Sequence, residues 1–197
     1  MRRCVWLVAV ALFVVIGAGV RRAGATMVVP ASLDELAAGA VAIFHGRVAD
    51  VQPRWEPGRR RIESFVAIEV VDYLKGNLGP LVVIRVPGGE LGPYRSIVVG
   101  APTLTPGDEV ILFVGANGPS YPYVLGLDQG VFRVVRTNAR QPSMVLPPPV
   151  ASRTNAPGRV VRGDPQRRPP TLEAFVSQVR ALVEQVAGGA RAVGASR

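Results

Sequence analysis

The sequence predicts a mainly β protein, a small OB-like antiparallel barrel of six or seven strands. Apolar and polar residues alternate with the period of a β-strand through most of residues 41–136. Turns that contain Gly or Pro divide this region into short segments, and the brief connections favour antiparallel pairing. The length of 197 residues suits one domain with a hydrophobic core. We therefore expect a β-barrel domain at residues 32–137.

The first expected element is a short N-terminal helix. Ser32 and Glu35 have the spacing of a capping box, in which each side chain accepts a hydrogen bond from the other residue's backbone amide. Gly39 is expected to end this helix. From Val41 the pattern changes to strict alternation, so a long first strand follows directly.

Two long antiparallel strands come next, separated by the turn Glu56-Pro57-Gly58. On the first strand His45 shares a face with Ile43 and Arg47, opposite Phe44. We interpret the face of His45 as the solvent side. Because His45 is the only histidine, neither a multi-histidine metal site nor a hydrolytic triad is expected.

The later strands are expected at residues 81–86, 95–99, 109–114, 121–127 and 131–136. Residues 87–89 are interpreted as a turn. The segment 109–114 is apolar on both faces, which indicates a strand covered on both sides at the centre of the sheet. Residues 128–130 are predicted to join the last two strands as a hairpin, with Gly130 in the left-handed position.

After residue 137 the composition shifts to Pro, Arg, Asn and Gly, so residues 138–170 are predicted to be an extended linker without a packed core. Thr171 then caps an amphipathic helix over residues 171–187, and residues 188–197 are expected to be a flexible C-terminus that begins at Gly188-Gly189. We favour docking of the helix on the barrel, with docking on a partner protein as the alternative. Its apolar stripe consists of Leu172, Phe175, Val176, Val179, Leu182, Val183 and Val186.

Residues 1–25 have the features of a cleaved export signal: Arg2-Arg3, an uncharged run over residues 5–20, and a small-residue cleavage site that ends at Ala25. We expect a secreted or periplasmic protein that uses the general secretory route. Retention as an N-terminal membrane anchor is the alternative, because Arg21-Arg22 follow the apolar run. Cleavage removes Cys4, the only cysteine, and with it any disulfide, cysteine nucleophile or thiolate metal site.

The remaining sequence lacks a nucleophile elbow, a phosphate-binding loop and a dinucleotide fingerprint. No catalytic residue, cofactor or metal ligand is therefore assigned. A hydrolase that uses two loop carboxylates stays an alternative, and the candidates are Glu90, Asp108, Glu109 and Asp128. The basic residues are spread along the chain, so specific nucleic-acid binding is not expected.

The candidate ligand or partner surface combines basic and aromatic residues at the ends of strands. Arg59, Arg60 and Arg61 would contact an anionic polymer, an anionic lipid or an acidic protein through charge-assisted hydrogen bonds. The aromatic residues Tyr94, Tyr121 and Tyr123 would form a stacking platform for a ligand. The simpler explanation of the arginines is solvation of the surface, and that of the tyrosines is plugging of the barrel.

Several segments resemble a group of uncharacterised exported bacterial β-barrel proteins; they are residues 44–48, 70–76, 86–89, 100–102, 106–113 and 126–132. More distantly, the layout is similar to the OB-type barrel of the netrin-like and metalloproteinase-inhibitor domains. This second resemblance implies binding or inhibition. Those inhibitors use an N-terminal cysteine, which the expected mature chain lacks, so that mechanism does not carry over.

These observations favour an exported, non-enzymatic binding or structural module of the bacterial envelope or extracellular space. An unknown envelope or secreted protein, or an anionic polymer, is the expected partner. An inhibitor-like partner of a secreted peptidase is the first alternative, and the hydrolase is the second.

Overall fold

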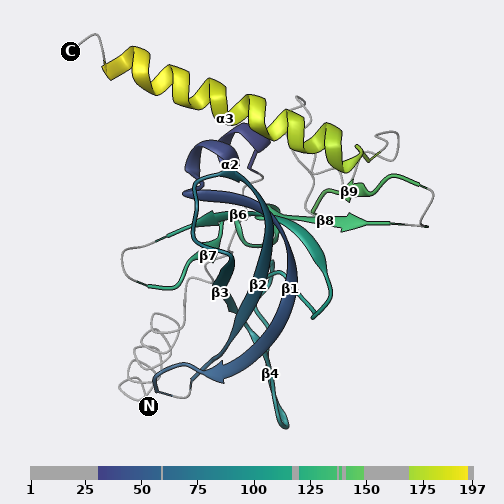
Figure 1. Cartoon of the computed structure of the whole chain (residues 1–197). Helices are drawn as coiled ribbons and strands as arrows, with labels where there is room; N and C mark the ends of the chain where they lie inside the picture. Colours follow the sequence, from purple (N-terminus) through teal and green to yellow (C-terminus); the bar gives the residue numbers. More distant parts are fainter. Residues whose placement is uncertain are drawn as a thin grey trace, which may run out of the picture.

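A computed structural model describes residues 31–58, 60–116, 120–136, 138, 141–148 and 169–194, with side chains up to residue 188. The predicted export signal with Ala25, as well as Arg59 and most of the predicted linker, lie outside the described residues. The chain forms a mainly β fold with one short and one long helix (Figure 1). Its elements are α2 Leu33–Gly39, β1 Ala42–Trp55, β2 Ile62–Lys75, β3 Leu81–Pro87, β4 Gly89–Leu91, β5 Tyr94–Ser96, β6 Glu109–Gly115, β7 Tyr123–Val124, the 3-10 helix η1 Leu127–Gly130, β8 Val131–Val135, β9 Met144–Leu146 and α3 Leu172–Gly194.

Five strands close into a barrel, which confirms the predicted fold class. The sheet order is β1-β2-β3-β7-β6-β8-β9, and an additional pairing of β1 with β6 closes the ring. The long β1 and β2 pair along their whole length, from Ile43 opposite Lys75 to Trp55 opposite Ile62. The closure between β3 and β7 is short, because Arg85 opposite Tyr123 is its one paired position among the described residues.

Helix α2 begins as predicted. The Ser32 amide donates to Glu35 Oε2 at 2.8 Å, and the Glu35 amide donates to Ser32 Oγ at 3.4 Å, which completes the capping box. At the other end, Lys75 Nζ donates to the carbonyl of Ala37 at 2.8 Å. The single lysine of the chain therefore satisfies an end carbonyl of this helix. Burial lowers the pKa of the Lys75 ammonium.

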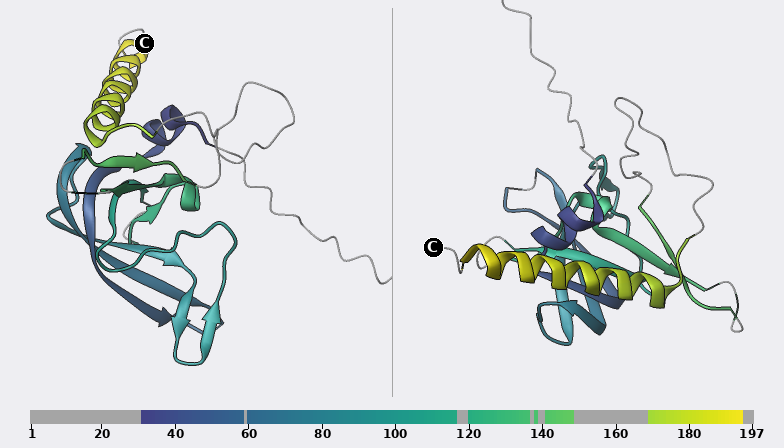
Figure 2. Two further views of the ribbon diagram at one scale, coloured as in Figure 1. Left: turned by 90° about the vertical axis from the view of Figure 1, so that its right-hand side faces the viewer. Right: turned by 90° about the horizontal axis from the view of Figure 1, so that it is seen from above.

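The segment after β3 differs from the prediction. Residues 87–89 do not form a simple turn, because β4 begins at Gly89 and pairs with β5 as a hairpin. A side chain at Gly89 would place its Cβ 2.5 Å from Ser64 Oγ. Glycine therefore lets the chain cross the end of β2 and form a hairpin that projects from the barrel (Figures 1 and 2).

The predicted hairpin between the last two barrel strands is wrong. β7 and β8 both pair with the same edge of β6, β7 at Val114 and Gly115 and β8 at residues 109–112. They therefore form one interrupted strand, and η1 bulges out between them. Beyond it, β9 pairs with β8, and Val145 is buried, so the predicted linker of residues 138–170 contributes a strand to the packed domain.

The barrel sheet has two apolar faces. Phe44, Ile68 and Leu112 belong to the interior cluster, whereas Phe113 and Phe132 belong to a second cluster on the outer face. Helices α2 and α3 cover this outer face (Figure 2). This arrangement explains why β6 is apolar on both faces, as the sequence indicated.

Helix α3 packs on the chain's own barrel through the predicted stripe. Phe175 and Val179 are buried in the outer-face cluster, and Leu172, Val176, Leu182 and Val183 pack at its edge. The Ala174 amide donates to Thr171 Oγ1 at 3.3 Å, which confirms Thr171 as the cap. Gly188-Gly189 does not end the helix, contrary to prediction: α3 continues to Gly194. Alanines on both sides of the glycine pair favour helix and offset its cost. Among the described residues, no helix has the length and apolarity to cross a membrane.

Candidate binding site at the barrel mouth

A cavity of about 370 Å³ lies beside the β4–β5 hairpin, which projects from one end of the barrel (Figure 1). Val51, Val66 and Val86, from three different barrel strands, form one wall. The hairpin and the loop of residues 97–104 form the other wall. We define the barrel mouth as this cavity together with the β4–β5 hairpin and the loop of residues 97–104. The volume lies within the range of small ligand pockets.

Three consecutive aliphatic residues stand exposed at the barrel mouth. Ile97 is 73% exposed, Val98 is 37% exposed and Val99 is 86% exposed. We call these three residues the aliphatic rim. The sequence predicted a strand here, but β5 ends at Ser96 and the rim continues as a loop. Single exposed aliphatic residues are ordinary on protein surfaces, whereas a contiguous group beside a cavity is typical of an interaction site.

Tyr94 lies at the barrel mouth and contacts the neighbouring β1–β2 hairpin. Its ring centroid is 5.3 Å from that of Trp55 in an edge-to-face contact. Arg60 and Arg61 follow Trp55 at the exposed tip of the same hairpin. Within the described part of the chain, neither arginine forms an ion pair. The structure therefore brings Tyr94, Arg60 and Arg61 of the predicted surface to one end of the barrel.

Tyr121 and Tyr123 do not line the cavity of the barrel mouth, but they lie near it, since a second cavity, which Tyr123 lines, shares Val86, Pro87 and Pro102 with the first. The Tyr121 ring lies 5.0 Å from that of Phe65, and the Arg54 guanidinium stacks 5.1 Å over the same Phe65 ring. This second cavity has a volume of about 260 Å³ and lies beside Arg85, where β7 meets β3. The predicted tyrosine platform is therefore divided between two places.

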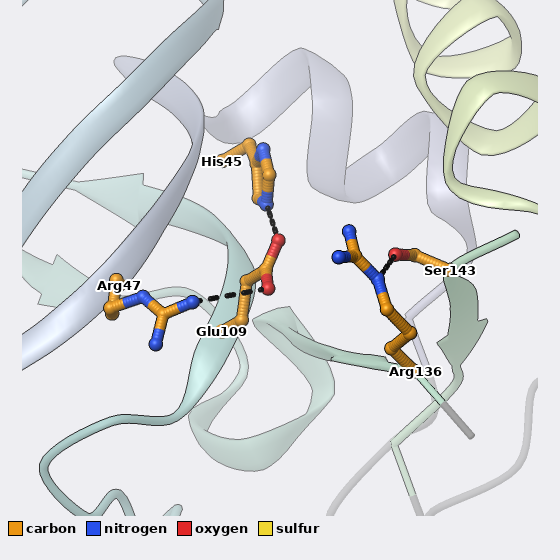
Figure 3. A network of polar contacts seen from close by, with 5 residues as sticks. All are labelled: His45, Arg47, Glu109, Arg136 and Ser143. Atoms are coloured by element: carbon orange, nitrogen blue, oxygen red, sulfur yellow. Dashed lines mark hydrogen bonds and ion pairs between the residues drawn. The ribbon is translucent and has the colours of Figure 1, made fainter. Parts of the chain in front are cut away.

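The acidic candidates have separate structural contacts. Glu109 Oε1 lies 2.8 Å from Nε2 of His45, and Glu109 Oε2 lies 3.7 Å from Arg47 (Figure 3). Glu90 forms an ion pair with Arg95 across the hairpin at 2.9 Å, and Asp108 accepts a hydrogen bond from the Thr105 amide. The described residues contain no group of three or more His, Cys, Asp or Glu placed to hold a metal ion.

His45 is buried, so its predicted exposure is wrong. It is 8% exposed, because α2 and α3 cover the face that the alternation assigned to solvent. Figure 3 also shows Arg136, whose Nε lies 3.2 Å from the hydroxyl of the buried Ser143. The His45–Glu109 contact therefore has a structural explanation, because a buried polar side chain needs a hydrogen-bond partner.

Asp128 connects η1 with the barrel mouth. Its amide donates to the carbonyl of Gly100, immediately after the aliphatic rim, at 2.8 Å. Asp128 Oδ1 is buried and accepts no hydrogen bond from any described residue. Burial raises the pKa of the Asp128 carboxyl, and the charge of Arg133 opposes part of this effect. The preceding Leu127 has a left-handed backbone with φ of 60°, a strained conformation for leucine.

The sequence offered little indication of the aliphatic rim as a site, because a run of Ile and Val is also the pattern of a buried strand. Its neighbour Gly100 was the one available indication of a turn. Comparison of the sequence with protein-family models and with curated proteins finds no match.

Proposed function

We propose that this protein is an exported, non-enzymatic binding module of the bacterial envelope or extracellular space, and that its ligand binds at the barrel mouth. The aliphatic rim beside an open cavity is the observation that supports this proposal most directly. Trp55, Tyr94, Arg60 and Arg61 add aromatic and basic groups at the same end. The hydrolase and the inhibitor-like alternatives stay predictions, because no contact among the described residues favours either of them.

In this proposal the outer face of the barrel and the barrel mouth have different roles. The outer face is already occupied, since α2 and α3 bury its apolar residues. The aliphatic rim has no such cover from the described residues, and Val99 is 86% exposed. Burial of one valine side chain by a ligand contributes about 1.5–3 kcal/mol, so the rim alone is a substantial source of affinity.

A screen of the purified protein against three defined ligand classes tests the proposal. The classes are a displayed library of random peptides, a glycan array, and vesicles with and without anionic lipid. We expect at least one class to bind in a manner that depends on the rim, so that Val99→Asp weakens binding about tenfold or more, because it removes apolar contact and introduces a charge.

Val71→Asp is the matched control. Val71 is also an exposed valine, 67% accessible, but it lies on β2 outside the residues that line the barrel mouth. It should retain full binding. The proposal is wrong if no ligand class binds, or if Val99→Asp and Val71→Asp have equal effects.

A further inference from the structure

We infer that the ligand of the barrel mouth is an extended, acidic and aliphatic polypeptide segment that adds as a strand to the free edge of β5. This inference rests on the proposed function and specifies the class of partner. Three observations carry it: an unpaired strand edge, a cavity beside that edge, and a net positive charge on the neighbouring hairpin tip.

The hairpin β4–β5 is a separate two-stranded sheet. In the described part of the chain β5 pairs with β4 alone, so its second edge has no strand neighbour. The pairings and turn hydrogen bonds of the described residues also leave the amide of Ile97, directly after β5, without a backbone acceptor. An edge of this kind binds extended peptides by backbone hydrogen bonds, because it presents regularly spaced donors and acceptors.

The cavity supplies a place for side chains of the added strand. Arg95, Ser96, Ile97 and Val98 line the cavity, so the edge and the cavity are continuous. Successive side chains of a strand point to opposite faces. A peptide with an aliphatic residue at every second position therefore directs one row of side chains to the cavity and the aliphatic rim.

The charges near this edge favour an acidic peptide. Glu90 and Arg95 neutralise each other on the hairpin. The adjacent tip carries Arg60 and Arg61 against Glu56, beside the contact of Trp55 with Tyr94. Acidic side chains at the end of the peptide near Tyr94 would therefore meet a net positive charge, and that contact weakens as salt rises.

A lipid surface fits these observations less well. Arginines and exposed aliphatic residues suit an anionic membrane, but binding to a membrane would involve neither the backbone groups of the strand edge nor the cavity. Pairing of two copies through β5 would use the edge, but an antiparallel two-fold pairing places the arginine-bearing tips at opposite ends and supplies no acidic group to them. Both become outcomes of the test.

The test uses fluorescence anisotropy with dye-labelled synthetic peptides of alternating Asp and Val, alternating Lys and Val, and alternating Asp and Ser. We expect the Asp–Val peptide to bind at least tenfold more tightly than the other two. Methylation of its alternate backbone nitrogens should weaken binding tenfold or more in one of the two possible patterns, because it removes donors to the β5 edge.

Charge reversal provides the matched protein variants. Arg60→Glu with Arg61→Glu should invert the preference between the Asp–Val and Lys–Val peptides, whereas Arg180→Glu, on the exposed face of α3, should leave it unchanged. Circular dichroism confirms that each variant is folded.

The inference is overturned if no peptide binds, if both methylation patterns are harmless, or if Val99-dependent binding goes to anionic vesicles or to a second copy. If the binding goes to vesicles or to a second copy, a ligand still binds at the barrel mouth, so the proposed function survives while the peptide assignment fails. Absence of Val99-dependent binding in every ligand class removes both.

Discussion

Replacement of Phe175 by alanine tests whether α3 is an integral part of the folded domain. Phe175 is 4% exposed, and its ring centroid lies 4.8 Å from that of Phe132, which in turn lies 5.4 Å from Phe113. Truncation of a buried phenylalanine costs about 3–5 kcal/mol. Because a surface helix can shift to fill part of the space, we expect the lower end, about 3 kcal/mol. In a domain of this size that loss lowers Tm by about 6–12 °C.

Urea denaturation followed by circular dichroism measures this loss. Gln178→Ala is the control, because Gln178 is exposed on the same helix and its removal should change stability by less than about 0.5 kcal/mol. Equal stability of the Phe175→Ala protein and the unmodified protein would refute the reasoning. It would mean that α3 leaves the barrel in solution and is free for a partner.

Three further substitutions test local features of the fold. Asp128→Asn should raise Tm at neutral pH, because burial raises the pKa of the Asp128 carboxyl and so disfavours its charged form in the folded protein. The stability that the protonated carboxyl contributes is lost as the pH rises through the raised pKa, so the gain in Tm from asparagine should disappear below the ordinary pKa of 3.8. A gain in Tm that is the same at every pH would contradict this account. Gly46→Ala should destabilise the barrel by about 1–3 kcal/mol in urea denaturation, since a Cβ there would lie 2.7 Å from the carbonyl oxygen of Glu69. Gly188→Ala, where a Cβ meets nothing within 4 Å, should instead stabilise α3 by about 0.5–1 kcal/mol, and a loss there would point to an unrecognised contact.

The local patterns in the sequence predicted most of the barrel. The capping box at Ser32, the long β1 and β2, and the doubly covered β6 all follow from spacing and alternation within short segments. The closing helix also follows, since its apolar stripe required a surface to cover. These elements were predictable because one local property decides each of them.

The errors arise where a distant part of the chain decides the outcome. His45 is buried because α2 and α3, the latter more than 120 residues later, cover the outer face of the sheet. The supposed hairpin at residues 128–130 fails because β6 accepts both β7 and β8 on one edge. The aliphatic rim has the composition of a strand, and only the end of β5 at Ser96 leaves it exposed. No local pattern contains these three facts.

The two apolar regions of the barrel should behave independently. β6 carries both, since Leu112 faces the barrel interior and Phe113 faces the helices, and strand geometry keeps the two rows of side chains apart. Val99, at the barrel mouth, belongs to neither cluster. We therefore expect the changes in unfolding free energy caused by Phe175→Ala and by Val99→Asp to add within about 0.3–0.5 kcal/mol in the double variant. We also expect Phe175→Ala to leave ligand affinity at the barrel mouth unchanged below its unfolding transition. A larger coupling energy, measured by the same denaturation series, would show that α3 influences the mouth through β6, and the separation of a covered face from a binding end would then be wrong.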